Sequence, residues 1–265
     1  MKITNVVSAL RDCIPASCPH ALFWRASYAI FPTICISVAA SMGFSVNSAA
    51  ANGTVCNAFN PAQFQVGAEW EKTSRMTFGG MQPYISFVHS KVAGPTNFLG
   101  HNVLDVTTIA KIIPKSSLNK RNKIGRNDRS IDTFYRIGGN SVYFYGTRRE
   151  YTDPPQSFPK NYAVNVPYTS RFVNHIPGEA AASSMPGRAT RTFLGMETTT
   201  VPAGTFMTCK IREQIFGGSG KPAITDTWVV TSGKYVGFEV KSEFYSPTGS
   251  PTGKSVTLSM RLNGS

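Results

Sequence analysis

Hydrophobic and polar residues alternate most regularly within the segment Thr190–Tyr245. In Met207–Ile215 the odd-numbered positions are mostly apolar and the even-numbered positions are polar, and the same alternation returns in Ile224–Val230 and Val236–Phe244. A period of two is typical of a strand with one buried face and one solvated face. Three such strands in succession, joined by short turns that contain Gly and Pro, predict an antiparallel meander.

A second clear pattern is the predicted hairpin Thr133–Tyr145. Its two β-forming arms flank Gly138–Asn140, a Gly-Gly-Asn sequence that supplies the positive-φ positions of a tight turn. The last strand candidate is Ser255–Leu262, where apolar and polar residues again alternate. For Val103–Ile113 the periodicity leaves both a strand and a short helix open.

Two segments between these strands are expected to be irregular. Tyr151–Pro159 is rich in proline and favours a loop, and Ile176–Arg188, with Pro and Gly near both ends, is predicted to be a connector. Asn161–Val173, which lies between them, carries one strand candidate that Pro167 limits. Because helical patterns are weak beyond the first fifty residues, the chain is predicted to be mainly β.

The first part of the chain differs in composition from the rest. An apolar run, Tyr28–Phe44, follows Arg11 and Arg25, and the small residues Ser48–Ala51 come after it. This order is typical of a cleaved signal peptide, here residues 1–51, which leaves residues 52–265 as a single β-rich domain. A short membrane anchor or a buried helix is the alternative, although the run is short for spanning a bilayer. We expect a periplasmic or secreted protein with no transmembrane anchor after processing.

The cysteines agree with export. Only Cys56 and Cys209 would remain after processing, and an even pair in an oxidising compartment predicts a disulfide between them. The alternative is two unrelated buried thiols. The residues before Cys56 lack the usual pattern of a lipidated cysteine, so a lipid anchor is not expected.

The net charge favours an anionic partner. The chain has 27 Lys and Arg against 14 Asp and Glu, a formal net charge of +13. The densest basic run includes Lys120, Arg121, Lys123 and Arg126. Either this run is a solvated loop, or it contacts an anionic envelope surface or a protein partner. Nucleic acid is not expected as a partner, because no aromatic residue is interleaved in the run.

Motifs for cofactors and metals are absent or incomplete. Thr248–Ser255 resembles a phosphate-binding loop, but it lacks the first glycine and a strand pattern follows it instead of a helix. Gly217–Gly220 does not complete a nucleophile elbow, because residue 221 is lysine. His89, His101 and His175 are not spaced as metal ligands. The sequence therefore predicts no cofactor and no metal, and it assigns no catalytic residue.

Asp226 and Glu213 occupy strand positions whose neighbours in phase are apolar. They are either functional carboxylates or, as we prefer, buried polar groups whose hydrogen bonds are satisfied or residues at a strand edge. Large apolar residues of the meander are expected to share an inner face. That face is either a packed core or the lining of an apolar cavity. The candidate cavity-lining residues are Met207, Ile211, Trp228, Phe238 and Phe244.

The meander also resembles a known group of proteins. Glu197, the sequence Val-Pro-Ala-Gly-Thr-Phe at 201–206, Trp228 and the sequence Gly-Phe-Glu-Val-Lys at 237–241 are similar to the C-terminal half of uncharacterised bacterial periplasmic proteins. Those proteins have half-barrel folds similar to the lipoprotein-localisation factors. The resemblance implies a single large curved antiparallel sheet, a half-barrel or open barrel with few helices, around an apolar concave face. It implies no catalytic residue.

Three functions remain open at this point. The leading hypothesis is an exported, non-enzymatic β protein whose concave apolar face binds a lipid, an acyl chain or a hydrophobic protein segment. The first alternative is an envelope scaffold or protein-interaction module that uses the basic run. The second is a secreted hydrolase, which would need polar groups that converge in a cleft. Binding is favoured over catalysis.

Overall fold

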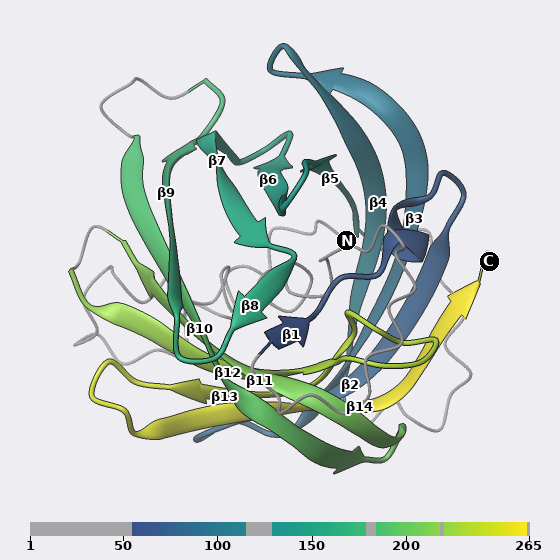
Figure 1. The fold of residues 1–265 in the computed structure, drawn as a ribbon, viewed down its shortest axis with the longest axis vertical. Coiled ribbons are helices and arrows are strands. Elements are labelled where there is room, and N and C mark those ends of the chain that lie inside the picture. The colour runs from purple at the N-terminus through teal and green to yellow at the C-terminus, as the bar shows by residue number, and fades with distance from the viewer. Residues whose placement is uncertain (1–54, 115–128, 179–183, 218–219, 264–265) are drawn as a thin grey trace, which may run out of the picture. The chain divides into compact units, whose positions relative to one another are not determined.

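The computed structural model describes residues 55–114, 129–178, 184–217 and 220–263. The predicted signal peptide at residues 1–51 and the basic run at Lys120, Arg121, Lys123 and Arg126 lie outside the described residues. Strands dominate the described part, which confirms the prediction of a mainly β protein (Figure 1). No helix within it is long and apolar enough to cross a membrane.

The strands form a closed antiparallel barrel. In barrel order the strands are β10 (Met185–Val201), β11 (Gly204–Phe216), β12 (Pro222–Val230), β13 (Glu239–Tyr245), β14 (Pro251–Asn263), β2 (Glu69–Phe78), β3 (Tyr84–Phe98), β4 (His101–Pro114), β5 (Arg129–Ile137), β6 (Ser141–Thr147), β7 (Tyr151–Pro159) and β9 (Pro167–His175), and β9 pairs back onto β10. The expected half-barrel or open barrel is therefore wrong in one respect, because the sheet closes on itself. Closure removes the two exposed edges that an open sheet would present.

The closing strands come from segments that the sequence analysis assigned to loops. Tyr151–Pro159, expected to be a loop, is β7, and the last residues of the expected connector Ile176–Arg188 begin β10. Met185–Arg188 pair with Arg171–Asn174 of β9, so the former connector supplies part of the closure. Val103–Ile113 lies within β4, and the hairpin Thr133–Tyr145 is confirmed as β5 and β6.

The joint between β7 and β9 is the shortest in the barrel. Its register joins Tyr151 to His175 and Thr152 to Asn174. Further along β7, side chains make the connection: the Ser157 amide donates to the Ser170 hydroxyl at 2.8 Å. Three prolines in β7 lack the N–H that a ladder needs, which explains why the pairing is short.

A small second sheet lies against the barrel wall. It pairs β1 (Val55–Asn57) with β8 (Asn161–Ala163), and in the projection of Figure 1 both lie within the ring of barrel strands. After β1 the chain continues into a 3-10 helix, η2 (Pro61–Phe64), whose N-cap Asn60 accepts a hydrogen bond from the Ala62 amide.

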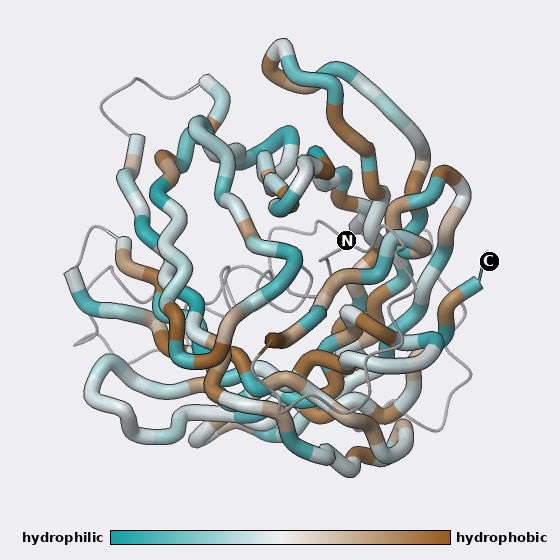
Figure 2. The backbone as a smooth tube through the Cα atoms, in the orientation of Figure 1, coloured by the Kyte–Doolittle hydropathy of each residue, from teal (hydrophilic) through white to brown (hydrophobic). Residues whose placement is uncertain are grey.

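This inserted segment crosses the barrel. Cys56 at its start is bonded to β11, whereas Phe64 at its end packs edge-on against Tyr135 of β5, several strands away in the barrel order. The intervening Phe59 is buried and stacks on Phe64. Polar and apolar residues are interspersed along this segment as they are along the strands (Figure 2).

Candidate functional site

The inner face of the barrel can be followed from strand to strand through the register. Cys209, Ile211 and Glu213 share one face of β11, and that face contacts the inserted segment at Cys56. Paired residues of neighbouring strands lie on the same side of a sheet. From Ile211 the paired, buried positions run through Thr227, Ser242, Ser255 and Met76. The inner wall is therefore rich in small hydroxyl side chains.

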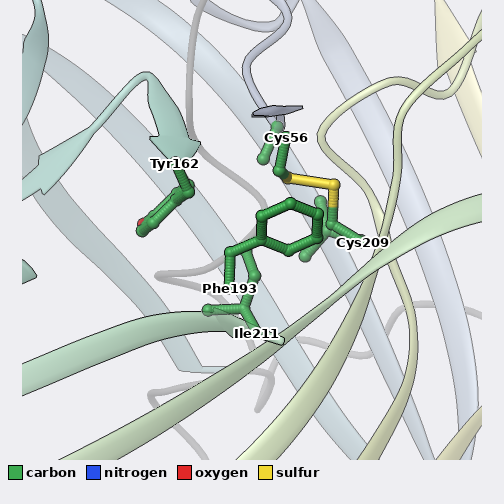
Figure 3. Close-up of a cluster of buried hydrophobic side chains, with 7 residues drawn as sticks. Cys56, Tyr162, Phe193, Cys209 and Ile211 are labelled. Carbon is green, nitrogen blue, oxygen red and sulfur yellow. A yellow bond between two sulfur atoms is a disulfide. The ribbon is translucent and has the colours of Figure 1, made fainter. Parts of the chain in front are cut away.

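The predicted disulfide between Cys56 and Cys209 is present (Figure 3). It joins β1 to the inner face of β11 and is buried. Phe193 and Ile211 from the wall and Tyr162 from β8 pack around it. The bridge therefore fixes the start of the inserted segment to a small apolar core.

The first of two interior ion pairs joins β2 to β13. Lys72 Nζ lies 3.5 Å from Glu239 Oε1, and the two side chains are only 5% and 1% exposed. Burial raises the pKa of Glu239, and the charge of Lys72 offsets part of that rise. The Glu213 carboxylate raises it further, so the two interior carboxylates interact electrostatically.

The second interior ion pair joins β10 to β11. Arg191 and Glu213 are register partners, both are buried, and their charged groups are in contact. The Arg191 guanidinium also lies over the Phe158 ring and donates to the Ser157 carbonyl oxygen at 3.2 Å. Arg191 thus connects β10 to β7 across the position of β9.

Two interior polar side chains have no hydrogen-bond partner among the described residues. Neither the oxygen nor the nitrogen of the Gln63 amide is paired, and Gln63 is 0% exposed. The Ser74 hydroxyl, on the same face of β2 as Lys72, is also unpaired and buried. Buried polar groups normally find partners, so these two side chains are exceptions within the described interior. We call Gln63, Lys72, Ser74 and Glu239 the interior polar site.

Asp226 belongs to the outer face, not to this site. Its carboxylate is buried and accepts two hydrogen bonds from Arg212, at 2.7 and 2.9 Å. Lys210 Nζ lies 3.3 Å away. Burial acts to raise the pKa of Asp226, but the hydrogen bonds and charges of Arg212 and Lys210 outweigh it and lower that pKa. Asp226 and Glu213 are therefore both satisfied by cations, which is the interpretation that the sequence favoured.

The structure does not bring the five candidate cavity-lining residues onto one face. Ile211 is register partner of Thr227, whereas Trp228 is partner of Lys210, so Trp228 and Ile211 lie on opposite faces. Trp228 is enclosed by the side chains of Lys210 and Lys241. Trp228 also donates from its ring nitrogen to Glu197.

Met207 and Phe244 lie on the same face as Ile211, the latter through the pairs Glu213–Thr225 and Thr225–Phe244, but they make their contacts elsewhere. Phe238 is buried against Tyr235, Phe244 stacks on Phe78, and Met207 is exposed. The alternation correctly marked these positions as apolar, but most of them are packed in different clusters.

Met207 instead belongs to an exposed apolar group near the disulfide. Met196 is register partner of Cys209, Met207 lies two residues before it, and Val55 precedes Cys56. Val166 joins them, because its amide bonds to Ala163, the register partner of Val55. The exposed fractions are 55% for Val55, 57% for Val166, 38% for Met196 and 43% for Met207. We call these four residues the apolar rim.

Comparisons with known proteins add likenesses in fold. No protein-family model matches the chain, and no curated protein sequence matches it. The chain is similar to a Bacteroides fragilis protein described as exported and as having a YmcC-like fold, with a TM-score of 0.44 and 12% identity over 74% of this chain and 96% of that one. It is also similar to a Parabacteroides distasonis protein described as a lipoprotein, with a TM-score of 0.38 and 16% identity over 75% of this chain and 96% of that one.

Sequence reasoning missed most of the interior polar site, although a signal was present. Lys72 and Ser74 alternate in phase with Trp70 and Met76, so two polar residues occupy positions that the pattern assigns to the buried face. Gln63 lies between Ala62 and Phe64 in a segment with no periodicity, and its burial depends on the inserted segment. Within the described residues, no group of His, Cys, Asp or Glu is arranged to hold a metal ion.

Proposed function

We propose that the protein is an exported, non-enzymatic binding protein that contacts an acyl chain through the apolar rim. The observation that carries this proposal is that four exposed, large apolar side chains lie close, in sequence or in strand register, to one disulfide. Single exposed apolar residues are ordinary on protein surfaces, whereas grouped ones mark interaction sites. Met196 and Met207 are flexible and polarisable, which suits a partner without a fixed shape.

Two observations support the remaining parts of the proposal. The buried disulfide favours an oxidising compartment, in agreement with a periplasmic or secreted protein. Binding is favoured over catalysis because the buried carboxylates Glu213, Asp226 and Glu239 are each held by a cation. A general acid or base needs to exchange its proton with a substrate instead.

The proposal is tested by titrating the purified protein with a fluorescent fatty acid. In the double variant Met196→Ser and Met207→Ser, each substitution removes roughly 1 kcal/mol of partial burial in the complex, so we expect about 30-fold weaker binding. The control is Met81→Ser, a methionine in the turn before β3 that is 55% exposed. Equal affinity of the parent and the double variant would refute the proposal. Capture of an apolar peptide in place of the fatty acid would also refute it.

A second candidate rests on the net charge of +13. The chain would then be an envelope scaffold whose basic run at Lys120, Arg121, Lys123 and Arg126 contacts an anionic surface or protein. Replacing Lys120, Arg121 and Lys123 by Glu should abolish sedimentation of the protein with phosphatidylglycerol vesicles. Undiminished sedimentation would remove the basic run from the interaction.

A further inference from the structure

Two arginines lie directly opposite each other on the outer face of the barrel. Strands β9 and β10 run side by side (Figure 1), and their register pairs Arg171 with Arg188. Paired residues of neighbouring strands lie on the same side of a sheet. Both arginines are exposed, whereas the adjacent residues Ser170, Phe172 and Ala189 are buried. Like charges in directly opposite positions destabilise a sheet, so strand formation does not account for this pair.

No carboxylate of the described residues compensates the two positive charges. Strand β9 contains no Asp or Glu, and the single acidic residue of β10, Glu197, lies in its far half. The single acidic residue of β11, Glu213, is buried in the interior. Among the described residues neither Arg171 nor Arg188 forms an ion pair, although Asp153 follows the part of β7 that is paired with β9. Both positive charges are therefore available to an anion from outside the chain.

Two neighbouring features prepare this pair to bind an anion. The Arg188 guanidinium lies 4.2 Å from the centre of the Phe216 ring, and such stacking orients a guanidinium while its N–H groups remain free to donate. Thr169 and Thr190 form a register pair two residues along the same face, roughly 7 Å from the arginines along the strands. Their hydroxyls are hydrogen-bonded at 3.1 Å, so one of them keeps its own O–H free to donate.

We propose that Arg171 and Arg188 together bind a phosphate group that carries two negative charges. A guanidinium presents parallel N–H donors that match two oxygens of a phosphate, and two arginines match its double charge. A phosphate monoester carries about 1.5 to 2 negative charges at pH 7, whereas a carboxylate carries only one. Free inorganic phosphate and the head group of a phosphomonoester lipid present the same chemistry to this site. The proposal depends neither on the apolar rim nor on the basic run.

Two binding assays test the proposal. Calorimetric titration with inorganic phosphate at low ionic strength tests the free anion, and sedimentation with phosphatidylcholine vesicles that contain phosphatidic acid tests the lipid head group. The pair variant combines Arg171→Gln and Arg188→Gln, which removes both charges and keeps the side chains polar. The matched control combines Arg75→Gln and Arg261→Gln, because both of these arginines are exposed on barrel strands and neither has a cation as register partner.

We expect one phosphate group bound per chain, with a dissociation constant that the pair variant raises by at least about tenfold and the control leaves unchanged. Binding of inorganic phosphate alone would identify free phosphate as the ligand, and binding of the vesicles alone would identify the lipid head group. The absence of binding in both assays would overturn the proposal. Equal weakening by the pair variant and the control would also overturn it, because net charge alone would then attract the phosphate.

Urea unfolding with and without phosphate gives a second readout. A ligand that binds only the folded state raises stability, so phosphate should raise the unfolding midpoint of the parent and of the control but not that of the pair variant. An equal rise in all three proteins would contradict the assignment to Arg171 and Arg188. The single variant Arg171→Gln leaves Arg188 stacked on Phe216 and keeps both tests available if the pair variant does not fold.

Discussion

The interior ion pair between Lys72 and Glu239 gives the sharpest test of how this barrel is stabilised. Replacing Lys72 by Met leaves a carboxylate that is 1% exposed without its cation. At a separation of 3.5 Å and an effective dielectric constant of 20, the lost attraction is about 5 kcal/mol. Breaking a buried pair in this way typically destabilises proteins by about 3–5 kcal/mol, and we expect a value in that range.

A double variant distinguishes the energy of the interaction between Lys72 and Glu239 from the effect of changing either residue alone. When Glu239→Gln accompanies Lys72→Met, neither charge of this pair remains, and the double variant should lie within about 1 kcal/mol of the parent. The coupling energy from the cycle should therefore be several kcal/mol. A matched surface control is Lys91→Met, because Lys91 pairs with Glu69 at 3.1 Å while the two side chains are 56% and 32% exposed. We expect that control to have little effect on stability.

The loss of stability caused by Lys72→Met should also depend on pH. Burial raises the pKa of Glu239 in the folded protein, so the folded state binds this proton more tightly than the unfolded state does. The stability that this proton contributes is present below the unfolded pKa of about 4.3 and is lost as the pH rises through the folded pKa. Without Lys72 the folded pKa rises further. The variant and the parent should therefore converge near pH 4 and diverge toward pH 7.5.

Urea unfolding of the oxidised proteins, followed by fluorescence of the buried residues Trp70 and Trp228, measures these differences. A loss at pH 7.5 no larger than that of Lys91→Met would refute the assignment of Lys72 as the charge that holds Glu239 in the interior. A loss that stays constant down to pH 4 would show that packing of the lysine stem, and not the charge, is responsible.

Three further outcomes follow from the described contacts. The double variant Cys56→Ala and Cys209→Ala releases a bridge that closes a separation of 153 residues, and urea unfolding should show a loss of about 5 kcal/mol. Asp226→Asn should lose about 2 kcal/mol at pH 7. Because the folded pKa of Asp226 is lowered, this difference is fully present above the unfolded pKa of about 3.9 and is lost as the pH falls through the lower folded pKa. Gly237→Ala should destabilise the folded protein by about 1–3 kcal/mol, and by more than the control Gly233→Ala. Both glycines have positive φ, but only at Gly237 would the new Cβ meet a carbonyl oxygen of the inserted segment, at 3.0 Å.

The alternation of residue types predicted the strands well and their closure poorly. Period-two patterns and Gly-rich turns are local signals, so the hairpin of β5 and β6 and the strand β14 could be identified from the sequence. Closure depends on pairing between β9 and β10 and on β7, whose prolines give it the composition of a loop. A proline-rich strand is tolerated here because its pairing with β9 is short.

Alternation also gives the period of a strand without giving its phase relative to the neighbouring strand. Ile211 and Trp228 each lie in a clear apolar series, and a shared inner face was the natural expectation. The register between β11 and β12 places Trp228 opposite Lys210 instead. A shift of one residue in that register would have put Trp228 inside, and the local pattern alone does not distinguish the two.

The polar inner wall also restricts where a hydrophobic ligand can bind. An acyl chain placed against Lys72, Glu239 and Ser74 would cover charged and hydroxyl groups without offering them hydrogen bonds, which is unfavourable for each group. The same chain at Met196 and Met207 would cover side chains that are already apolar and exposed. A lipid-binding function is therefore more favourable at the rim of this barrel than beside Lys72, Ser74 and Glu239.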